Sequence, residues 1–409
     1  MGLNDTPTAE RTHIGIFGRR NAGKSSLLNA ITGQNLAIVS GQKGTTTDPV
    51  SKSMELLPLG PVVFIDTPGL DDEGDMGELR VKKSYQVLNK TDIGLLVVDG
   101  ECLLHGREGD FGETEKPILK EFVKREIPYI IVVNKEEMLS DGEREKALQI
   151  TGEPENTVFV SAVNKTNIEE LKKRIAQRKP EDKAPGKLVG DLLEPGDLAV
   201  LVVPIDASAP KGRLILPQQQ VIRDCLEAGA IPVTVRETEL QRALDVLKRT
   251  PRLVITDSQV FDQVDRILPR DISLTSFSIL LARYKGNLKS QAEGAKAIDR
   301  LKEGDKVLIA ESCTHHRQCE DIGTVKLPKW LKNHTKKNLD LTFSSGTEFP
   351  EDLSEYSLVI HCGGCMVNER EMKYRLNCAE NANVPMTNYG AAIAHMHGIL
   401  ERAIEIFHL

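Results

Sequence analysis

The feature that most constrains this chain is an eight-residue motif near its N-terminus, Gly18-Arg-Arg-Asn-Ala-Gly-Lys-Ser25, with the pattern GxxxxGK followed by serine. An apolar stretch, His13–Phe17, precedes the motif and a helical stretch, Ser25–Ala30, follows it. This strand–loop–helix context is the one that a phosphate-binding loop requires. Backbone N–H groups of such a loop surround phosphate oxygens, and the helix N-terminus adds a favourable partial charge. The residues expected to hold phosphate are Gly18, Asn21, Ala22, Gly23, Lys24, Ser25 and Ser26.

Further residues are placed to complete a magnesium and γ-phosphate site. Lys24 should reach the β- and γ-phosphates, and the Ser25 hydroxyl should bind Mg²⁺. Asp66 directly follows the apolar stretch 62–65 and would hold Mg²⁺ through water, while the Gly69 N–H would contact the γ-phosphate. Thr46, in the segment 44–48, is the expected switch threonine that also binds Mg²⁺. We therefore expect Lys24, Thr46, Asp66 and Gly69 to act in nucleotide hydrolysis.

Two later motifs predict a guanine site. Both follow apolar stretches, one over 129–133 and one over 158–160. The residues expected to recognise guanine are Asn134, Lys135, Glu137, Ser161 and Ala162. The first motif departs from the usual NKxD pattern, because Glu137 stands where an aspartate normally accepts hydrogen bonds from guanine. The longer side chain needs a backbone shift or a different rotamer, and the neighbouring Glu136 offers a second carboxylate.

The motifs together resemble those of the TrmE–Era–EngA group of GTPases, which share the NAGKSS loop and the GTT-x-D switch segment. In that group the asparagine equivalent to Asn21 helps to hold K⁺, which replaces an arginine finger. Leu70 stands where Ras-type GTPases have the glutamine that orients water. The resemblance thus implies a GTPase that uses GTP, Mg²⁺ and K⁺, with slow intrinsic hydrolysis.

The pattern of apolar stretches divides the chain into three α/β domains. The first, residues 1–177, alternates strands and helices as a Ras-like P-loop domain does. A charged linker with two prolines spans 178–187. A smaller α/β domain over 188–271 shows no catalytic constellation, and we assign it to dimerisation. The last domain, 272–409, ends in an expected helix, Ala391–Phe407, and contains five of the seven cysteines.

Composition argues against several partners. The net charge is −7 and aromatic residues make up 4% of the chain, which disfavours nucleic-acid binding. No apolar run approaches the length of a membrane span, and the N-terminal stretch lacks the apolar core of a secretory signal. We therefore expect a cytoplasmic protein. An odd number of cysteines in that compartment indicates metal binding or catalysis rather than disulfides.

The cysteines gather around two expected strands. Cys313 follows the stretch 306–310, and His361-Cys362-Gly-Gly-Cys365 follows the stretch 358–360. If these strands are parallel neighbours, both segments lie at the carboxyl edge of the sheet, where α/β proteins build their sites. From the residues alone, a zinc ion and an iron–sulfur cluster remain about equally supported.

The combination of a GTPase domain with the spacing CxHx45HCxxC resembles the HydF family of [FeFe]-hydrogenase maturation GTPases. The resemblance implies a homodimer with a GTPase domain, a dimerisation domain and a domain that holds a [4Fe–4S] cluster. Its ligands would be Cys313, Cys362 and Cys365, with His361 a candidate exchangeable fourth. Cys319 and Cys378 are expected not to bind iron. The family receives a diiron carbonyl and cyanide precursor from two radical-SAM enzymes and delivers it to the hydrogenase.

Two other functions fit parts of the sequence. The first is a GTPase that acts in tRNA modification or ribosome assembly and carries a structural zinc site. The second is an adaptor in which zinc is purely structural. Iron and sulfide content separates both from the cluster scaffold.

Overall fold

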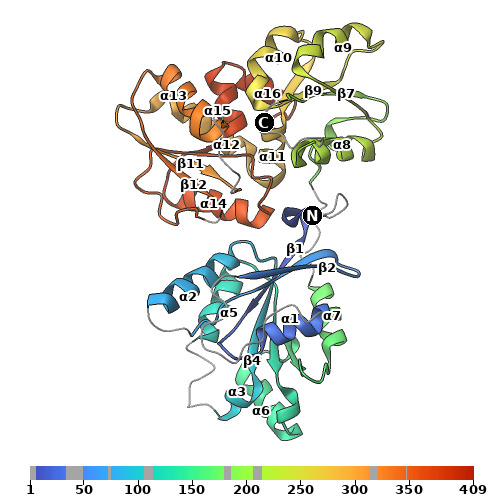
Figure 1. The fold of residues 1–409 in the computed structure, drawn as a ribbon, viewed down its shortest axis with the longest axis vertical. Coiled ribbons are helices and arrows are strands. Elements are labelled where there is room, and N and C mark those ends of the chain that lie inside the picture. Colours follow the sequence, from blue (N-terminus) through green and yellow to red (C-terminus); the bar gives the residue numbers. More distant parts are fainter. Residues whose placement is uncertain are drawn as a thin grey trace. The chain divides into compact units, whose positions relative to one another are not determined.

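The computed structural model describes residues 6–33, 49–71, 75–105, 114–178, 186–205, 214–313, 321–346 and 348–409. The chain divides into two compact units, Met1–Lys183 and Ala184–Leu409 (Figure 1). Within the described ranges, no helix is both long and apolar enough to cross a membrane.

The first unit is built on one six-stranded sheet. The strands are β1 (Thr12–Phe17), β2 (Val50–Leu56), β3 (Gly60–Asp66), β4 (Ile93–Asp99), β5 (Tyr129–Asn134) and β6 (Thr157–Val160). Their order is β2-β3-β1-β4-β5-β6, and all pairs are parallel except the edge pair β2–β3. The central strands are almost continuously apolar because helices cover both faces of a parallel sheet. This arrangement confirms the α/β fold expected for the N-terminal domain.

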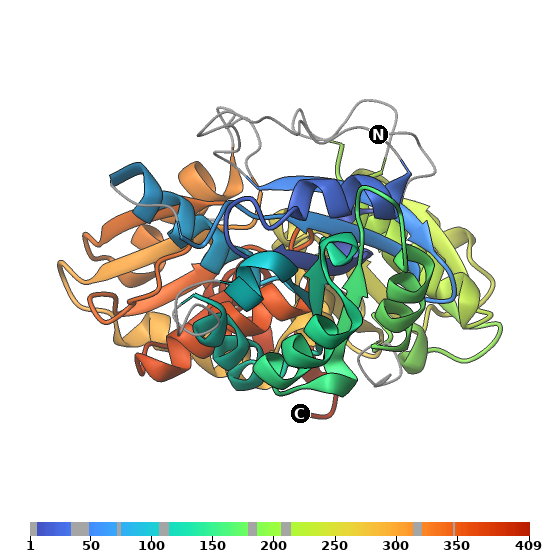
Figure 2. The ribbon, with the colours of Figure 1, turned by 90° about the horizontal axis from the view of Figure 1, so that it is seen from below.

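Helices cover the two faces of this sheet unequally (Figure 2). One face packs against α1 (Lys24–Thr32) and α7 (Ile168–Gln177). The other face packs against α2 (Asp75–Leu88), α3 (Gly100–His105), α5 (Glu115–Lys124) and α6 (Asp141–Thr151). Because β1, β3, β5 and β6 are parallel, the loops that follow them leave the sheet at one common edge, the carboxyl edge of the strands.

The second unit contains two four-stranded parallel sheets. The first has the order β10-β9-β7-β8 and the second has the order β12-β11-β13-β14. The strands are β7 (Leu198–Val202), β8 (Ile231–Val235), β9 (Leu253–Thr256), β10 (Ser273–Ser276), β11 (Lys306–Glu311), β12 (Asp340–Ser345), β13 (Leu358–His361) and β14 (Met386–Asn388). Strand β10 pairs with β9, so the first sheet continues past residue 271, where the sequence analysis placed a domain boundary.

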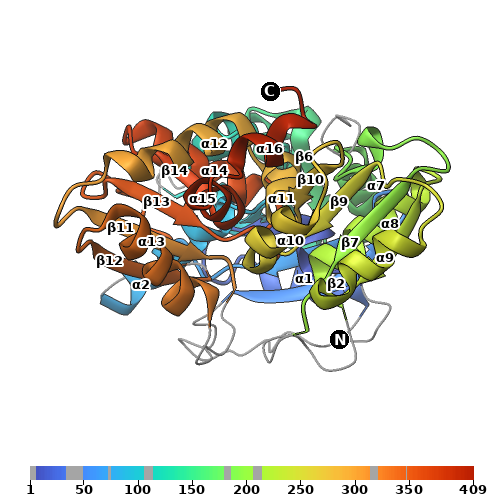
Figure 3. The same ribbon diagram turned by 90° about the horizontal axis from the view of Figure 1, so that it is seen from above.

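Helices from the C-terminal part of the unit join the two sheets (Figure 3). Apolar side chains of α15 and α16 pack into the core of the first sheet, although both helices follow the last strand of the second. The helices of this unit are α8 (Leu216–Glu227), α9 (Leu240–Val246), α10 (Phe261–Ile267), α11 (Phe277–Lys285), α12 (Leu288–Lys296), α13 (Leu327–Thr335), α14 (Glu369–Asn381), α15 (Tyr389–Met396) and α16 (Leu400–Glu405). The shared core explains why the two sheets form one compact unit.

The C-terminal helix differs from the sequence expectation. A single helix was predicted over Ala391–Phe407, but the structure has two helices, α15 and α16, separated by a turn. Gly398 in that turn has a φ of +73°, a left-handed conformation that ends α-helices and that glycine adopts without a Cβ penalty. The prediction of one continuous helix was therefore wrong.

Candidate functional sites

The phosphate-binding loop connects β1 to α1, and its lysine donates hydrogen bonds to carbonyl groups at the start of the loop. Gly23 has a φ of +91°, and a Cβ there would lie 2.2 Å from the Asn134 side-chain nitrogen, so only glycine fits. Lys24 is buried, and its Nζ donates hydrogen bonds to the carbonyl oxygens of Gly18 (3.0 Å) and Arg19 (2.8 Å). Lys24, Ser25 and Ser26 form the first turn of α1. The backbone N–H groups of this turn face the loop, as an anion site requires.

Ser25 and Asp66 form the part of the site suited to magnesium. The Ser25 hydroxyl donates to Asp66 Oδ2 at 2.6 Å, at the end of β3. Asp66 Oδ1 is buried and has no hydrogen-bond partner among the described residues. Burial raises the pKa of Asp66, while the Ser25 hydrogen bond and the charge of Lys24 lower it. A magnesium-bound water would satisfy this oxygen, so the residues fit Mg²⁺.

Of two other residues expected at the phosphate site, Gly69 lies within the described residues and Thr46 does not. Gly69 follows β3 closely, and a Cβ there would meet Arg20 atoms at 3.0 Å, so the backbones of the two loops approach each other directly. Asp71 Oδ1 accepts from the Arg20 N–H at 2.6 Å and reinforces this approach. Thr46, the expected switch threonine, lies outside the described residues.

Asn134 links the phosphate-binding loop to the guanine motifs. Its Nδ2 donates to the Ala22 carbonyl (3.0 Å), and its Oδ1 accepts from the Ala162 N–H (3.1 Å). Ser161 is fully buried at the end of β6, and its hydroxyl accepts from the Asn164 N–H at 3.0 Å. The structure therefore brings the three sequence motifs together through one buried amide.

The two glutamates of the segment Asn134-Lys-Glu-Glu137 have different surroundings. Glu136 is buried, and its carboxylate accepts from Asn167 Nδ2 at 3.2 and 3.3 Å. Glu137, in the short helix η2 (Glu136–Met138), is exposed. Lys135 has a φ of +64° and forms a hydrogen-bonded ion pair with Asp99. The hydrogen bond to Asp99 raises the pKa of Lys135. Of the two carboxylates, Glu137 is the one free to meet a base, and its role remains a prediction.

One contact of this site was not expected from the sequence. Arg19 Nε donates to Glu115 Oε1 at 2.7 Å, and Arg19 Nη2 donates to Glu115 Oε2 at 3.1 Å. Glu115 is buried at the start of α5, so this paired hydrogen bond anchors the phosphate-binding loop to a helix far along the chain. No local motif links two positions that distant in sequence.

The cysteine segments lie at the carboxyl edge of the second sheet in the second unit. Strands β11 and β13 are parallel neighbours, with Ala310 opposite His361, so the condition that the sequence analysis set for bringing the cysteine segments to one edge is met. The Cys362 N–H donates to the Ala310 carbonyl at 2.8 Å. The Ser312 N–H donates to Cys362 Sγ at 3.2 Å, and Cys313 is the next residue. Cys313 and Cys362 thus follow the ends of adjacent strands.

A buried lysine holds the CGGC loop. Lys285, from α11, donates to the carbonyl oxygens of Gly364 (2.9 Å), Cys365 (3.3 Å) and Val367 (2.7 Å). Gly364 has a φ of +69°, and a Cβ there would lie 2.2 Å from Met372 Cε. Burial raises the pKa of the Cys365 thiol to about 11, so metal must displace a proton from it. Lys285 could not be recognised from the sequence, because nothing near it in sequence resembles a metal site.

His361 has partners on both ring nitrogens. Arg375 Nη1 donates to His361 Nε2 at 2.9 Å, and because a guanidinium is only a donor, Nδ1 carries the proton and donates to the Cys362 carbonyl at 2.6 Å. Burial, and then the charge of Arg375, lower the pKa of His361 to about 3. Arg375 is itself held by Glu371 Oε1 at 2.9 Å. His361 can bind a metal through Nε2 only after exchanging Arg375, and its role as a fourth ligand remains a prediction.

The three cysteines share one edge without forming a compact ligand set. Over the described ranges, one group of three Cys, His or carboxylate ligand atoms lies within 4.8 Å of one another, and it consists of Asp299, His334 and His395. Cys378 lies in α14 and is half-buried. Cys319 lies outside the described residues.

Fold and site together define a P-loop GTPase domain joined to an oligomerisation unit. Residues 13–135 match the family described as 50S ribosome-binding GTPase. Residues 188–286 match the hydrogen maturase F dimerization domain, and residues 289–406 match the hydrogen maturase F tetramerization domain. The chain belongs to the hydrogen maturase F family, HydF, as its sequence predicted. The two matches support oligomerisation, and the match of the C-terminal segment to a tetramerization domain goes beyond the homodimer expected from the sequence.

Three curated relatives each match the chain over about two fifths of its length. GTPase Era of Carboxydothermus hydrogenoformans is 32% identical over 172 residues, which cover 41% of this chain and 55% of Era. GTPase Der of Wolinella succinogenes is 35% identical and covers 42% of this chain and 36% of Der. The tRNA modification GTPase MnmE of Lachnoclostridium phytofermentans is 35% identical and covers 40% and 33%. The chain therefore spans about half or less of these relatives, and all three are GTPases.

Proposed function

We propose that this chain is a GTP-hydrolysing scaffold of [FeFe]-hydrogenase maturation. It carries a [4Fe–4S] cluster on Cys313, Cys362 and Cys365, and it assembles and delivers the diiron precursor of the hydrogenase active site. The observation that carries the proposal is the meeting of the two cysteine segments at the carboxyl edge of β11 and β13. They meet in a chain that belongs to the hydrogen maturase F family.

The nucleotide site supports the hydrolytic part of the proposal. Lys24 is buried at the start of α1, where it would contact the β- and γ-phosphates. Ser25 and Asp66 supply the oxygens for Mg²⁺. Asn21 has an exposed side chain and a φ of +60° in the loop, a position from which it would bind K⁺. In this proposal GTP hydrolysis times the exchange of partners and leaves the iron chemistry to the second unit.

The surroundings of the cysteines suit an anionic iron–sulfur cluster. Lys285 places a buried positive charge beside the CGGC loop, where it would offset the charge of bound thiolates. The Ser312 N–H already donates to Cys362 Sγ, a type of hydrogen bond that tunes iron–sulfur centres. When bound, the cluster would supply an iron that can accept an incoming group.

The contacts of His361 support an exchangeable position on that iron. With Arg375 on Nε2, His361 does not offer a lone pair to iron, and the fourth ligand would come from solvent or cargo. Release of Arg375 would free His361 to bind instead. A weak neutral ligand suits a scaffold better than a fourth thiolate, because cargo must be able to displace it.

The proposed partners are two radical-SAM maturases and an [FeFe]-hydrogenase in the cytoplasm, with the protein acting as a homo-oligomer. The experiment combines the anaerobically reconstituted protein with both maturases and then with apo-hydrogenase. Hydrogen evolution is expected with the unaltered protein and with Cys102→Ser, whose cysteine is exposed in the other unit. Cys362→Ser should give none.

Full activation of hydrogenase by Cys362→Ser and Cys365→Ser would refute the scaffold assignment. If the protein instead binds zinc without sulfide and associates with ribosomal RNA or tRNA, the alternative GTPase function is correct.

A further inference from the structure

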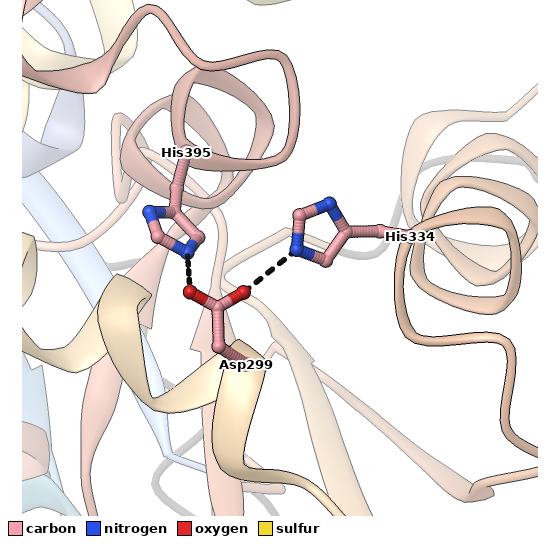
Figure 4. A group of neighbouring side chains, drawn as sticks. All are labelled: Asp299, His334 and His395. Carbon is pink, nitrogen blue, oxygen red and sulfur yellow. Dashed lines mark hydrogen bonds and ion pairs between the residues drawn. The ribbon is translucent and has the colours of Figure 1, made fainter.

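Asp299, His334 and His395 meet on the surface of the second unit although they are far apart in sequence (Figure 4). Asp299 lies in the short helix η7 (Ala297–Arg300), which directly follows α12. His334 and His395 lie in the last turns of α13 and α15. We call these three residues the His–Asp–His cluster. It joins three separate elements of the segment that matches the tetramerization domain.

The ligand atoms of the His–Asp–His cluster already have nearly the spacing that a metal ion requires. His334 Nε2 lies 2.7 Å from Asp299 Oδ1, and His395 Nε2 lies 3.0 Å from Asp299 Oδ2. All three ligand atoms lie within 4.8 Å of one another. Metal–ligand bonds of about 2.0–2.2 Å place neighbouring ligand atoms roughly 3.0–3.5 Å apart. Small side-chain movements would therefore direct both imidazoles and the carboxylate at one ion.

The electrostatic setting favours a cation. Carbonyl groups at the C-terminal ends of helices carry partial negative charge, and both histidines lie in such ends. Asp299 adds a full negative charge, and its hydrogen bond with His334 lowers the pKa of this carboxyl group. The side chains of His334, His395 and Asp299 are 29%, 17% and 54% exposed, so an ion can enter from solvent.

We propose that Asp299, His334 and His395 bind a divalent transition-metal ion, with zinc or ferrous iron as the best-matched ions. Two imidazoles and one carboxylate form a ligand set that both ions accept, and three protein ligands leave at least one position open. On binding, each Nε2 uses its lone pair for the metal, and its proton moves to Nδ1 or to solvent. The ion thereby replaces the two hydrogen bonds that now hold the cluster.

This site is separate from the cysteines. Helix α15 begins at Tyr389, whose hydroxyl donates to Glu311 Oε1 at the end of β11, close to Cys313 in sequence. His395 lies in the last turn of the same helix, about six residues further on, which is roughly 9 Å along its axis. The proposed ion would therefore tie η7, α13 and α15 together at the end of α15 away from the cysteine edge.

The experiment titrates the full-length double variant Cys362→Ser/Cys365→Ser with Co²⁺ under anaerobic conditions. Co²⁺ reports nitrogen and oxygen ligation through its visible absorption, and the serine substitutions remove two of the three proposed cluster thiolates. We expect one Co²⁺ per chain. Asp299→Asn, His334→Gln and His395→Gln should each weaken binding more than about 100-fold, because losing even an outer-shell partner costs 10–100-fold.

His397→Gln is the matched control. His397 follows α15, contacts the Trp330 ring edge and lies outside the cluster, so this variant should bind Co²⁺ like the parent. A second measurement avoids the serine background: Zn²⁺ should raise the melting temperature of the cluster-loaded unaltered protein and of His397→Gln, but not of the three cluster variants. Equal Co²⁺ binding, or an equal rise in melting temperature, in the three variants and the control would overturn the proposal.

Discussion

Replacing Asn134 with alanine should loosen the nucleotide site in two places at once. The substitution removes the hydrogen bond to the Ala22 carbonyl and the one from the Ala162 N–H, and both backbone groups belong to buried residues. Leaving a buried polar group unpaired costs about 1–3 kcal/mol, so with two such groups the first unit should lose about 2–6 kcal/mol of stability. If about 1.4 kcal/mol of this loss must be recovered on GTP binding to restore the positions of the two loops, GTP should bind roughly tenfold more weakly.

The two quantities need separate assays. The single tryptophan, Trp330, lies in the second unit, so its fluorescence does not follow unfolding of the first. Hydrogen exchange of the β1 and β5 peptides, read by mass spectrometry, measures the stability of the first unit, and a fluorescent GTP analogue measures affinity. Asn164→Ala is the control, since Asn164 is an exposed asparagine in the loop after β6. Unchanged exchange together with unchanged GTP affinity in Asn134→Ala would refute the linking role.

Three further outcomes are expected. GTP hydrolysis should be faster in potassium chloride than in sodium chloride of equal ionic strength, and Asn21→Ala should abolish the difference; equal rates in the unaltered protein contradict K⁺ binding. Glu137→Ala should weaken GTP by about 1.5–3 kcal/mol in equilibrium titrations, the range for hydrogen bonds to a charged group, and an unchanged dissociation constant rules out its guanine contact. Lys285→Met removes the ammonium that holds the CGGC loop, so iron content after reconstitution should fall relative to Lys289→Met, an exposed lysine control; equal iron in both variants counts against this role.

Sequence was most informative where structure follows from short-range signals. The phosphate-binding loop could be recognised because its glycines, lysine and serine are adjacent and stand between an apolar strand and a helix. The two apolar stretches that became β11 and β13 could be read as strands, and the structure shows the parallel pairing that the sequence raised only as a condition. Gly398 was a readable signal for the break between α15 and α16, and the apolar residues around it obscured that signal.

Contacts between distant positions could not be read in this way. Arg375 occupies a nitrogen of His361 because α14 packs beside β13, and neither residue belongs to a motif that indicates the pair. Lys285 reaches Cys365 from a helix 80 positions earlier in the chain. Tertiary packing determines these contacts, and in a single sequence a buried lysine or arginine looks the same as one on the surface.

The [4Fe–4S] cluster can be tested by measuring iron and acid-labile sulfide after anaerobic reconstitution, together with the electron paramagnetic resonance spectrum of the reduced protein. We expect about four iron atoms and about four sulfide ions per chain, with a signal that changes when cyanide or imidazole is added. Cys313→Ser, Cys362→Ser and Cys365→Ser should lose most of the iron, while Cys378→Ser retains it. Zinc without sulfide, or full iron content in the three serine variants, would show that these cysteines do not hold an iron–sulfur cluster.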